Sequence, residues 1–145
     1  MLSARELDIT WGNNRNYWRW ISIPEARFKE VPVLISVCWF NICAFTNSRL
    51  LSPGTRYSAY IVFQTNDGFY GFIYFDGGPS DGRREGEIRD VKKPEWREDG
   101  WMEVELGEFF NEDSCDEIKL RLKEIEYLNW KSGLIIQGVE FRPQR

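Results

Sequence analysis

The sequence contains no histidine and little cysteine. The absence of histidine excludes Ser–His–Asp and Cys–His nucleophilic centres, as well as zinc and haem sites with histidine ligands. Three cysteines, Cys38, Cys43 and Cys115, are too few for a four-cysteine zinc cage and show no disulfide-scaffold spacing. We therefore expect reduced thiols, no metal site and no cofactor.

Long apolar runs and an excess of positive charge are also missing. No run approaches the roughly 20 residues that a membrane-spanning helix needs. The first residues lack the basic and apolar segments of a secretory signal, so we expect a cytosolic protein. Nineteen Lys and Arg against 23 Asp and Glu give a net charge of −4, which disfavours a general phosphate-binding surface but leaves a local basic patch open.

Aromatic residues are abundant. They make up 16% of the 145 residues, with 7 Trp, 6 Tyr and 10 Phe, beside 42% hydrophobic and 29% charged residues. This composition supports a globular core, and the length fits one domain over residues 1–145. The number of rings suggests that some of them serve a surface.

The hydrophobic pattern predicts strands almost throughout. Apolar residues alternate or run continuously over 34–45, 57–65, 69–75, 101–106, 117–128 and 133–142. Many short strands at this spacing predict an all-β fold, a two-sheet antiparallel β-sandwich with jelly-roll-like connections. We expect a turn at 76–79, a long exposed excursion over 76–100 and a bulge near 123–124. One or two short helical turns are predicted, at 24–30 and 107–111.

Residues 9–20 combine large rings with amide side chains. Trp11 and Trp18 lie on either side of a polar turn that contains Asn13 and Asn14. Loops lie on surfaces, and flat rings beside amide groups suit a neutral polar ligand such as a sugar. We favour Trp11 and Trp18 as site residues; the alternative is that the rings close one end of the sandwich.

Four other tryptophans divide between core and surface. Trp39, inside an apolar strand, and Trp101, which opens an alternating strand, are predicted to pack in the core. Trp20 has the same parity as Trp18 along a strand, and core and site remain equally open for it. Trp130 lies in another loop, which could face the same end of the sandwich, and it too remains open.

Seven segments form a pattern that runs in order along the chain from about Ala4 to Pro143. They are Ile9-Thr10-Trp11, Tyr17-Trp18, Val37-Cys38-Trp39, Leu51-Ser52-Pro53, 57–63, 99–111 and 130–143. Together they resemble one known family, the phloem protein two lectins of plants, also called the Nictaba-like group. The length is similar to that of the small phloem-exudate lectins of cucurbits.

The resemblance implies a β-sandwich lectin that is not an enzyme. It implies binding of N-acetylglucosamine oligomers (chitooligosaccharides) and of the chitobiose core of N-glycans. It further implies homodimers in the cytoplasm or the phloem sieve elements and exudate, and an association with RNA or phloem filament protein. The family's two sugar-binding tryptophans fall on Trp11 and Trp18, and Arg15 stands where the family often has Pro. The predicted sugar-binding residues are Trp11, Asn13, Asn14, Tyr17, Trp18, Trp130 and Lys131.

The sequence leaves three other functions as alternatives. Hydrolysis of a glycosidic bond needs two carboxylates about 5–10 Å apart, and only the number of acidic residues, such as Glu124 and Glu126, supports it. RNA binding would use a basic strip of Arg83-Arg84, Lys92-Lys93 and Arg97, although acidic residues interleave with it. Filament cross-linking would use an exposed thiol, for which Cys115 is the candidate.

Overall fold

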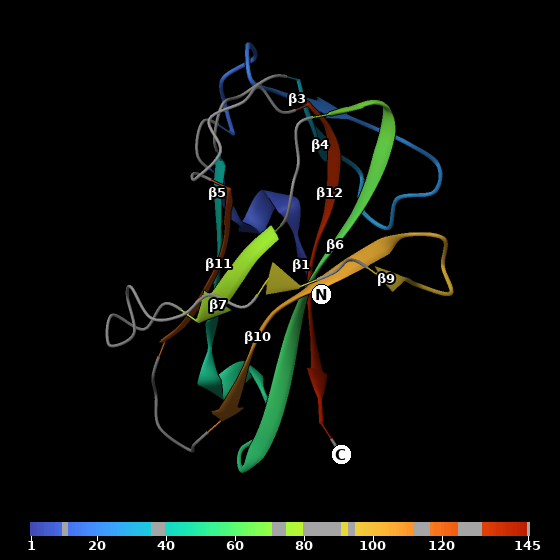
Figure 1. The fold of residues 1–145 in the computed structure, drawn as a ribbon. Helices are drawn as coiled ribbons and strands as arrows, with labels where there is room; N and C mark the ends of the chain where they lie inside the picture. Colours follow the sequence, from blue (N-terminus) through green and yellow to red (C-terminus); the bar gives the residue numbers. More distant parts are fainter. Residues whose placement is uncertain are drawn as a thin grey trace.

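The protein is an all-β fold of two curled antiparallel sheets (Figure 1). In the computed structural model, the residues described are 1–9, 12–35, 40–70, 75–79, 91–92, 95–111, 117–124 and 132–144. The predicted fold class is confirmed. Its only helical segments in these ranges are the 3-10 turns η1 (Ala4–Glu6) and η2 (Ser48–Leu50). None of the described helices is long and apolar enough to cross a bilayer.

Twelve strands are described, and they range from 2 to 16 residues. They are β1 (Leu2–Ser3), β2 (Asp8–Ile9), β3 (Trp18–Ile21), β4 (Val31–Leu34), β5 (Phe40–Asn47), β6 (Thr55–Tyr70), β7 (Phe75–Pro79), β8 (Val91–Lys92), β9 (Glu95–Trp96), β10 (Met102–Asn111), β11 (Glu117–Glu124) and β12 (Ser132–Pro143).

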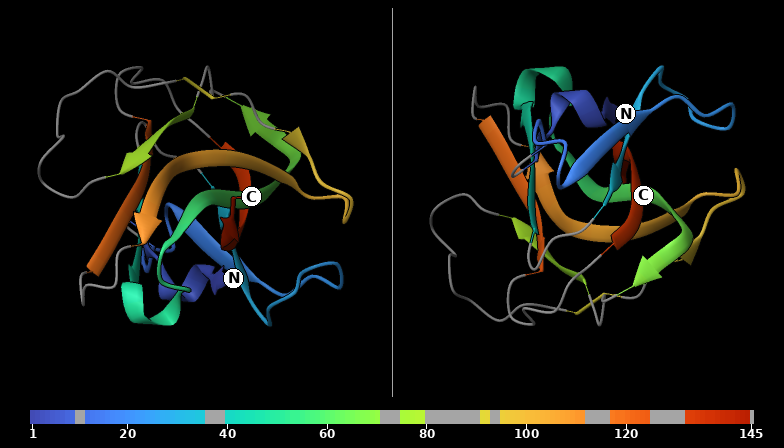
Figure 2. Two further views of the ribbon diagram at one scale, coloured as in Figure 1. Left: turned by 90° about the horizontal axis from the view of Figure 1, so that it is seen from below. Right: turned by 90° about the horizontal axis from the view of Figure 1, so that it is seen from above.

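The larger sheet is built around β12. Its strand order is β3-β4-β12-β6-β10-β9, and β1 adds to β12 at a second place along its edge. The smaller sheet has the order β2-β5-β11-β7-β8. Figure 1 shows β5, β11 and β7 on one side, with β6 and β12 on the other. The two views of Figure 2 show how strongly the sheets curl around the space between them.

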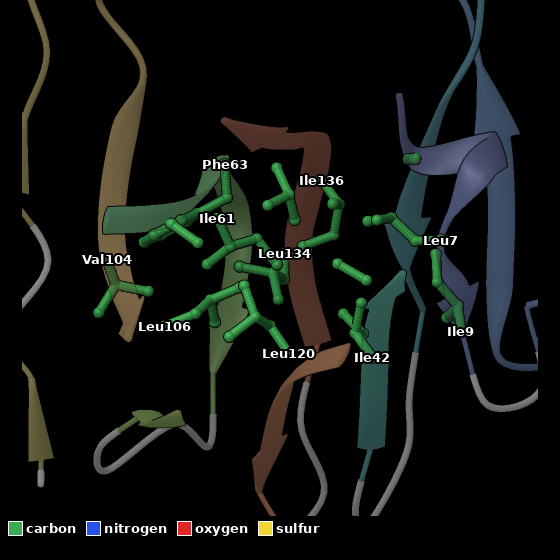
Figure 3. Packing of buried hydrophobic residues seen from close by; sticks show 14 of the residues in the cluster. Leu7, Ile9, Ile42, Ile61, Phe63, Val104, Leu106, Leu120, Leu134 and Ile136 are labelled. Atoms are coloured by element: carbon green, nitrogen blue, oxygen red, sulfur yellow. The ribbon is translucent and has the colours of Figure 1, made fainter. Parts of the chain in front are cut away.

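Alternation along β6 supplies one side of the core between the sheets, and β12 contributes Leu134, Ile136 and Val139 on either side of a register shift between Ile136 and Gly138. Tyr57, Ala59, Ile61 and Phe63 of β6 are all buried, as the sequence pattern predicted. Figure 3 shows the side chains of Ile61 and Phe63 in one cluster with residues of β10, β12, β5 and β11, namely Val104, Leu106, Leu134, Ile136, Ile42 and Leu120. Burying this apolar surface is the main favourable contribution to folding, at about 25 cal/mol per Å². The core also contacts η1 and β2, which brings the start of the chain against it.

A second, smaller cluster lies on the outer face of the larger sheet. Trp101 is buried there with Val62 and Ile135, beneath the 22–30 segment. The Trp101 indole N–H donates to the backbone oxygen of Glu25 at 3.2 Å. The core position predicted for Trp101 is therefore confirmed.

Two predicted helical turns are wrong. Residues 24–30 form turns and bends rather than a helix, because long-range contacts hold them, including a bond from Arg27 N to Gln137 Oε1 at 2.8 Å. Residues 107–111 continue β10 as a strand, past a bulge between Glu105 and Gly107. Phe109 remains on the inner side, where it stacks on Tyr57 with 5.8 Å between ring centroids.

Two strand boundaries also differ from the sequence pattern. The predicted turn at 76–79 lies within β7, which pairs with β11. The apolar run 34–45 is shared between two sheets, since β4 ends at Leu34 and β5 begins at Phe40. The strand predicted over 117–128 is described only as far as Glu124, so the bulge near 123–124 stays a prediction.

Candidate functional site

The polar segment 12–17 is a tightly hydrogen-bonded turn between β2 and β3. The backbone oxygen of Asn14 accepts from the N–H groups of both Tyr17 and Trp18, at 3.0 Å each. The Asn14 side-chain oxygen accepts from the N–H of Asn16 at 3.0 Å, which is an Asx turn. Asparagine therefore shapes this loop as well as presenting amide groups on it.

Gly12 closes the other side of the loop. Its N–H donates to the oxygen of Ile9 at 2.9 Å. A Cβ at this position would lie 3.0 Å from that oxygen and 3.1 Å from the Ile9 Cβ, tighter than ordinary contact. The Gly12 oxygen accepts from the Trp20 indole N–H at 2.8 Å, so a β3 side chain holds the turn.

Arg5 supports Trp20 from the outside. Its guanidinium carbon lies 3.6 Å from the centroid of the Trp20 ring, which is a cation–π contact. Arg5 also forms an ion pair with Glu30 at 3.2 Å, with both side chains about half exposed. Trp20 is partly buried against the main core, so the structure gives it a packing and positioning role beside the loop.

The loop surrounds an open hollow of about 610 Å³. In the described part of the chain it is lined by Ile9, Gly12, Asn13, Asn14 and Arg15. Asn13, Asn14 and Arg15 are exposed. Among the described lining residues, the widely open hollow thus presents the apolar side chain of Ile9 beside amide and guanidinium groups, which can contact a small polar ligand.

Two of the predicted site residues, Asn13 and Asn14, line this hollow. Tyr17 lies at the end of the turn, half-buried and packed against the core. Its N–H bond to Asn14 and the bond from Ile35 N to Tyr17 O, at 2.8 Å, anchor the turn to the end of β4. Trp11, Trp130 and Lys131 lie outside the described residues, as do Trp39, Cys38 and Cys115.

The surface position predicted for Trp18 is wrong. Trp18 is the first residue of β3, and its ring is only 1% exposed and belongs to the main core. It pairs with Leu34 of β4 and faces inward, since strand geometry rather than loop geometry orients its side chain. Its indole N–H is buried and finds no hydrogen-bond acceptor among the described residues. A contribution of Trp18 to sugar binding stays a prediction.

Sequence reasoning did not identify the parts played by Gly12 and Arg15 in this hollow. In the sequence, Arg15 stands out as a departure from the resembled family, which often has Pro at that position. A usable signal was present, since Arg15 is the single charged residue between Gly12 and Trp18. The bond between Trp20 and Gly12 joins two segments of different conformation, and no local pattern encodes it.

A polar cluster on the outer face of the larger sheet was also not predicted. Arg97 Nη1 lies 3.1 Å from Glu103 and 2.5 Å from Glu140, and Arg97 Nη2 lies 3.1 Å from Asp99. Arg142 pairs with Glu103 and lies over the ring of Tyr60, 3.8 Å from its centroid. These contacts tie the β9–β10 turn to β12.

The charges of this cluster perturb one another. Burial disfavours the charged form of Arg97, but hydrogen bonds and attraction from Asp99 and Glu140 outweigh it and raise the Arg97 pKa. Burial would likewise raise the pKa of Asp99, but bonds from Arg97 and from the Trp101 N–H outweigh it and lower that pKa. Arg97, the one side chain of the predicted basic strip that is described, is therefore bound by carboxylates.

Comparison with known protein families gives a clear assignment. Residues 1–143 match the family model described as Phloem protein 2. The chain belongs to the phloem protein 2 family. The predicted resemblance is thereby confirmed, and the hollow described above lies within the matched region.

Several phloem protein 2 relatives in Arabidopsis thaliana are similar over the whole chain. "F-box protein At2g02240" is 56% identical, "Putative F-box protein PP2-B2" 51% and "F-box protein PP2-B10" 49%, each over 100% of this chain. The matches cover 51%, 53% and 60% of those proteins. The chain thus spans about half the length of these relatives, which are longer than the small exudate lectins suggested by its length.

Proposed function

We propose that the chain is a non-catalytic lectin domain that binds N-acetylglucosamine oligomers and the chitobiose core of N-glycans. The observation that carries this proposal is the hollow lined by Ile9 and residues 12–15, where amide groups lie beside the apolar side chain of Ile9 in a chain of the phloem protein 2 family. Such a ligand offers C–H faces for apolar contact and acetamido groups for hydrogen bonding.

The proposed roles follow from the geometry of the loop. The amides of Asn13 and Asn14 would hydrogen-bond the acetamido and hydroxyl groups, since both residues line the hollow and are exposed. Tyr17 and Trp18 would contribute indirectly, by anchoring the turn through their backbone N–H bonds to the Asn14 oxygen. Stacking by Trp11, and a further wall from Trp130 and Lys131, complete the proposal.

The test is calorimetric titration of the chain with chitotriose, with cellotriose as the control. Cellotriose has the same linkage but lacks the acetamido groups. We expect binding to chitotriose alone, with a single-site free energy of about 4–8 kcal/mol, which is micromolar to millimolar. Absence of chitotriose binding to the folded protein would overturn the proposal.

Two variants locate the site. Asn13→Ala removes an amide that lines the hollow, and we expect it to weaken chitotriose binding about fivefold, as loss of one net hydrogen bond implies. Asn16→Ala is the matched control, because Asn16 is exposed on the same turn but does not line the hollow. Equal affinities of the two variants would place the sugar elsewhere.

The absence of catalysis and the assembly state belong to the same proposal. Long incubation with chitotetraose is expected to leave the sugar uncut. A homodimer would increase avidity for multivalent glycans without new contacts, and equilibrium sedimentation measures the assembly state.

We place the protein in the cytoplasm, with phloem sieve elements as its site of action. Because the relatives named as F-box proteins are about twice as long, we propose that this domain forms their glycan-recognising part.

A further inference from the structure

The hydrogen-bonding groups around the hollow are unequally used. The side-chain oxygen of Asn14 accepts from Asn16 N, and the backbone oxygen of Asn14 accepts two bonds. The oxygens of Ile9 and Gly12 accept from Gly12 N and from the Trp20 indole. These four oxygens are therefore already occupied by the protein's own donors.

The side-chain donors remain available. The amide N–H groups of Asn13 and Asn14 and the guanidinium of Arg15 make no hydrogen bond within the described residues. Asn13 Oδ1 is the one side-chain acceptor among the lining residues that is left uncommitted in the described part. Among the described lining residues, three side-chain donor groups and one side-chain acceptor are thus available to a ligand, which favours a ligand that is rich in acceptors.

The positive charge of Arg15 makes an anionic ligand the preferred acceptor-rich ligand. This residue lines the hollow and is exposed, and within the described ranges no carboxylate forms an ion pair with it. The other arginine near the loop, Arg5, is paired with Glu30 and stacked on Trp20. A planar guanidinium with five N–H groups matches an oxyanion, because both of its edges can donate at once.

We propose that the hollow selects acidic glycans, in which a carboxylate or a sulfate ester stands beside an N-acetylglucosamine unit. This inference rests on the proposed function, since it places the acidic group in the same hollow as the sugar. The oxyanion would be bound by Arg15, while the acetamido carbonyl accepts from the Asn13 or Asn14 amide.

Two anionic sugars, each compared with a neutral reference sugar, distinguish recognition of a carboxylate from recognition of a sulfate ester. Hyaluronan tetrasaccharide alternates glucuronic acid with N-acetylglucosamine, and its reference is chitotetraose. Chitotriose carrying one 6-O-sulfate tests the sulfate ester, and its reference is chitotriose. We expect at least one acidic probe to bind about threefold to tenfold more tightly than its reference at 50 mM NaCl, with a smaller ratio at 500 mM.

The variant Arg15→Gln tests the assignment to this residue. It keeps a long polar side chain and removes the charge, so the preference for the acidic probe should disappear while binding of the neutral reference persists. Arg19→Gln is the control, because it changes the net charge equally at an exposed position that does not line the hollow. Unchanged melting temperatures show that both variants are folded.

The outcomes distinguish the two proposals. Equal binding of acidic and neutral sugars by the unmodified chain would overturn the acidic preference and leave the lectin proposal standing. A preference that survives in Arg15→Gln, or that is lost equally in Arg19→Gln, would overturn the assignment to the hollow. Binding of the acidic probes alone would support the inference and overturn the proposal of chitooligosaccharide binding, and binding of no sugar would overturn both.

Discussion

The indole N–H of Trp20 donates to the backbone oxygen of Gly12 at 2.8 Å, and this bond ties β3 to the loop that precedes it. Trp20 is itself covered by the guanidinium of Arg5. The bond fixes one side of the hollow, while Asn14 fixes the other through its bonds to Tyr17 and Trp18. The hollow is therefore shaped before a ligand arrives, which lowers the entropic cost of binding.

The Trp20–Gly12 bond predicts that Trp20→Phe weakens sugar binding. Phenylalanine keeps a ring for Arg5 and for the core but leaves the Gly12 oxygen without its donor. We expect chitotriose affinity to fall about fivefold and the free energy of unfolding by about 1 kcal/mol. Calorimetry and urea denaturation measure the two effects. The control is Trp96→Phe, since Trp96 lies on edge strand β9 with 74% exposure. An affinity equal to that of the control would contradict the positioning role.

Substitution by Phe should have opposite effects on buried hydrogen bonding at Trp18 and at Trp101. Each ring is 1% exposed, but the Trp101 N–H donates to Glu25 whereas the Trp18 N–H finds no acceptor in the described part of the chain. Changing either residue to Phe creates a similar cavity. Trp101→Phe also breaks a hydrogen bond, while Trp18→Phe removes an unsatisfied donor whose burial is unfavourable.

We therefore expect Trp101→Phe to destabilise the protein by about 1–2 kcal/mol more than Trp18→Phe. Urea denaturation of the two variants, under identical conditions, gives the difference directly. A larger loss for Trp18→Phe would show that its N–H finds an acceptor in solution.

Asp99 predicts a pH-dependent contribution to stability. Its pKa in the folded protein lies below the ordinary value of 3.8, because bonds from Arg97 and from the Trp101 N–H outweigh the effect of burial. The stabilisation is therefore complete above about pH 4 and is lost as the pH falls through the lowered pKa. Asp99→Asn should reduce the melting temperature at pH 7, and this difference from the unmodified protein should vanish at low pH.

The control for this experiment is Asp8→Asn. Asp8 is an exposed carboxylate for which no ion pair is formed among the described residues. Its melting curves should follow those of the unmodified protein at every pH. A difference for Asp99→Asn that persists unchanged to pH 2 would show that the ion pair is not its cause.

The position of Gly138, at the centre of the larger sheet, leaves no room for a side chain. A Cβ at this position would lie 1.9 Å from the backbone oxygen of Leu2, because β1 pairs closely with β12 there. Gly138→Ala should destabilise the protein by about 1–3 kcal/mol or displace β1. Thermal melting and limited proteolysis near residue 3 measure the two results. Glu108→Ala, at an exposed position on β10 of the same sheet, serves as the reference; equal melting temperatures and equal cleavage would contradict the prediction.

The sequence predicted the strands whose side chains alternate between two environments. In β6 the inward series Tyr57, Ala59, Ile61 and Phe63 is buried without exception, and β12 lies where its apolar residues indicated. Two-sheet packing follows from several such strands, so the fold class could be inferred. The loop at 9–20 was also located correctly as a polar turn between strands.

Long-range contacts decided the elements that the sequence did not predict. Pro24 suggested a helix start, but Trp101 and Gln137, which are distant in sequence, hold the 22–30 segment in an irregular path. The polar turn before Trp18 predicts a surface position for it, yet pairing with Leu34 orients its ring inward. Moving the boundary between loop and strand by one residue moves each side chain of the strand to the opposite face of the sheet.

The central position of β12 has a consequence for synthesis on the ribosome. Strands β1, β4 and β6 all hydrogen-bond to β12, which is the last of the described strands to be translated. None of these three strands can complete its pairing in the larger sheet until residues 132–143 have left the exit tunnel. A nascent chain arrested before that point would leave the edge of β6 that faces β12 unpaired, and unpaired strand edges are prone to aggregation.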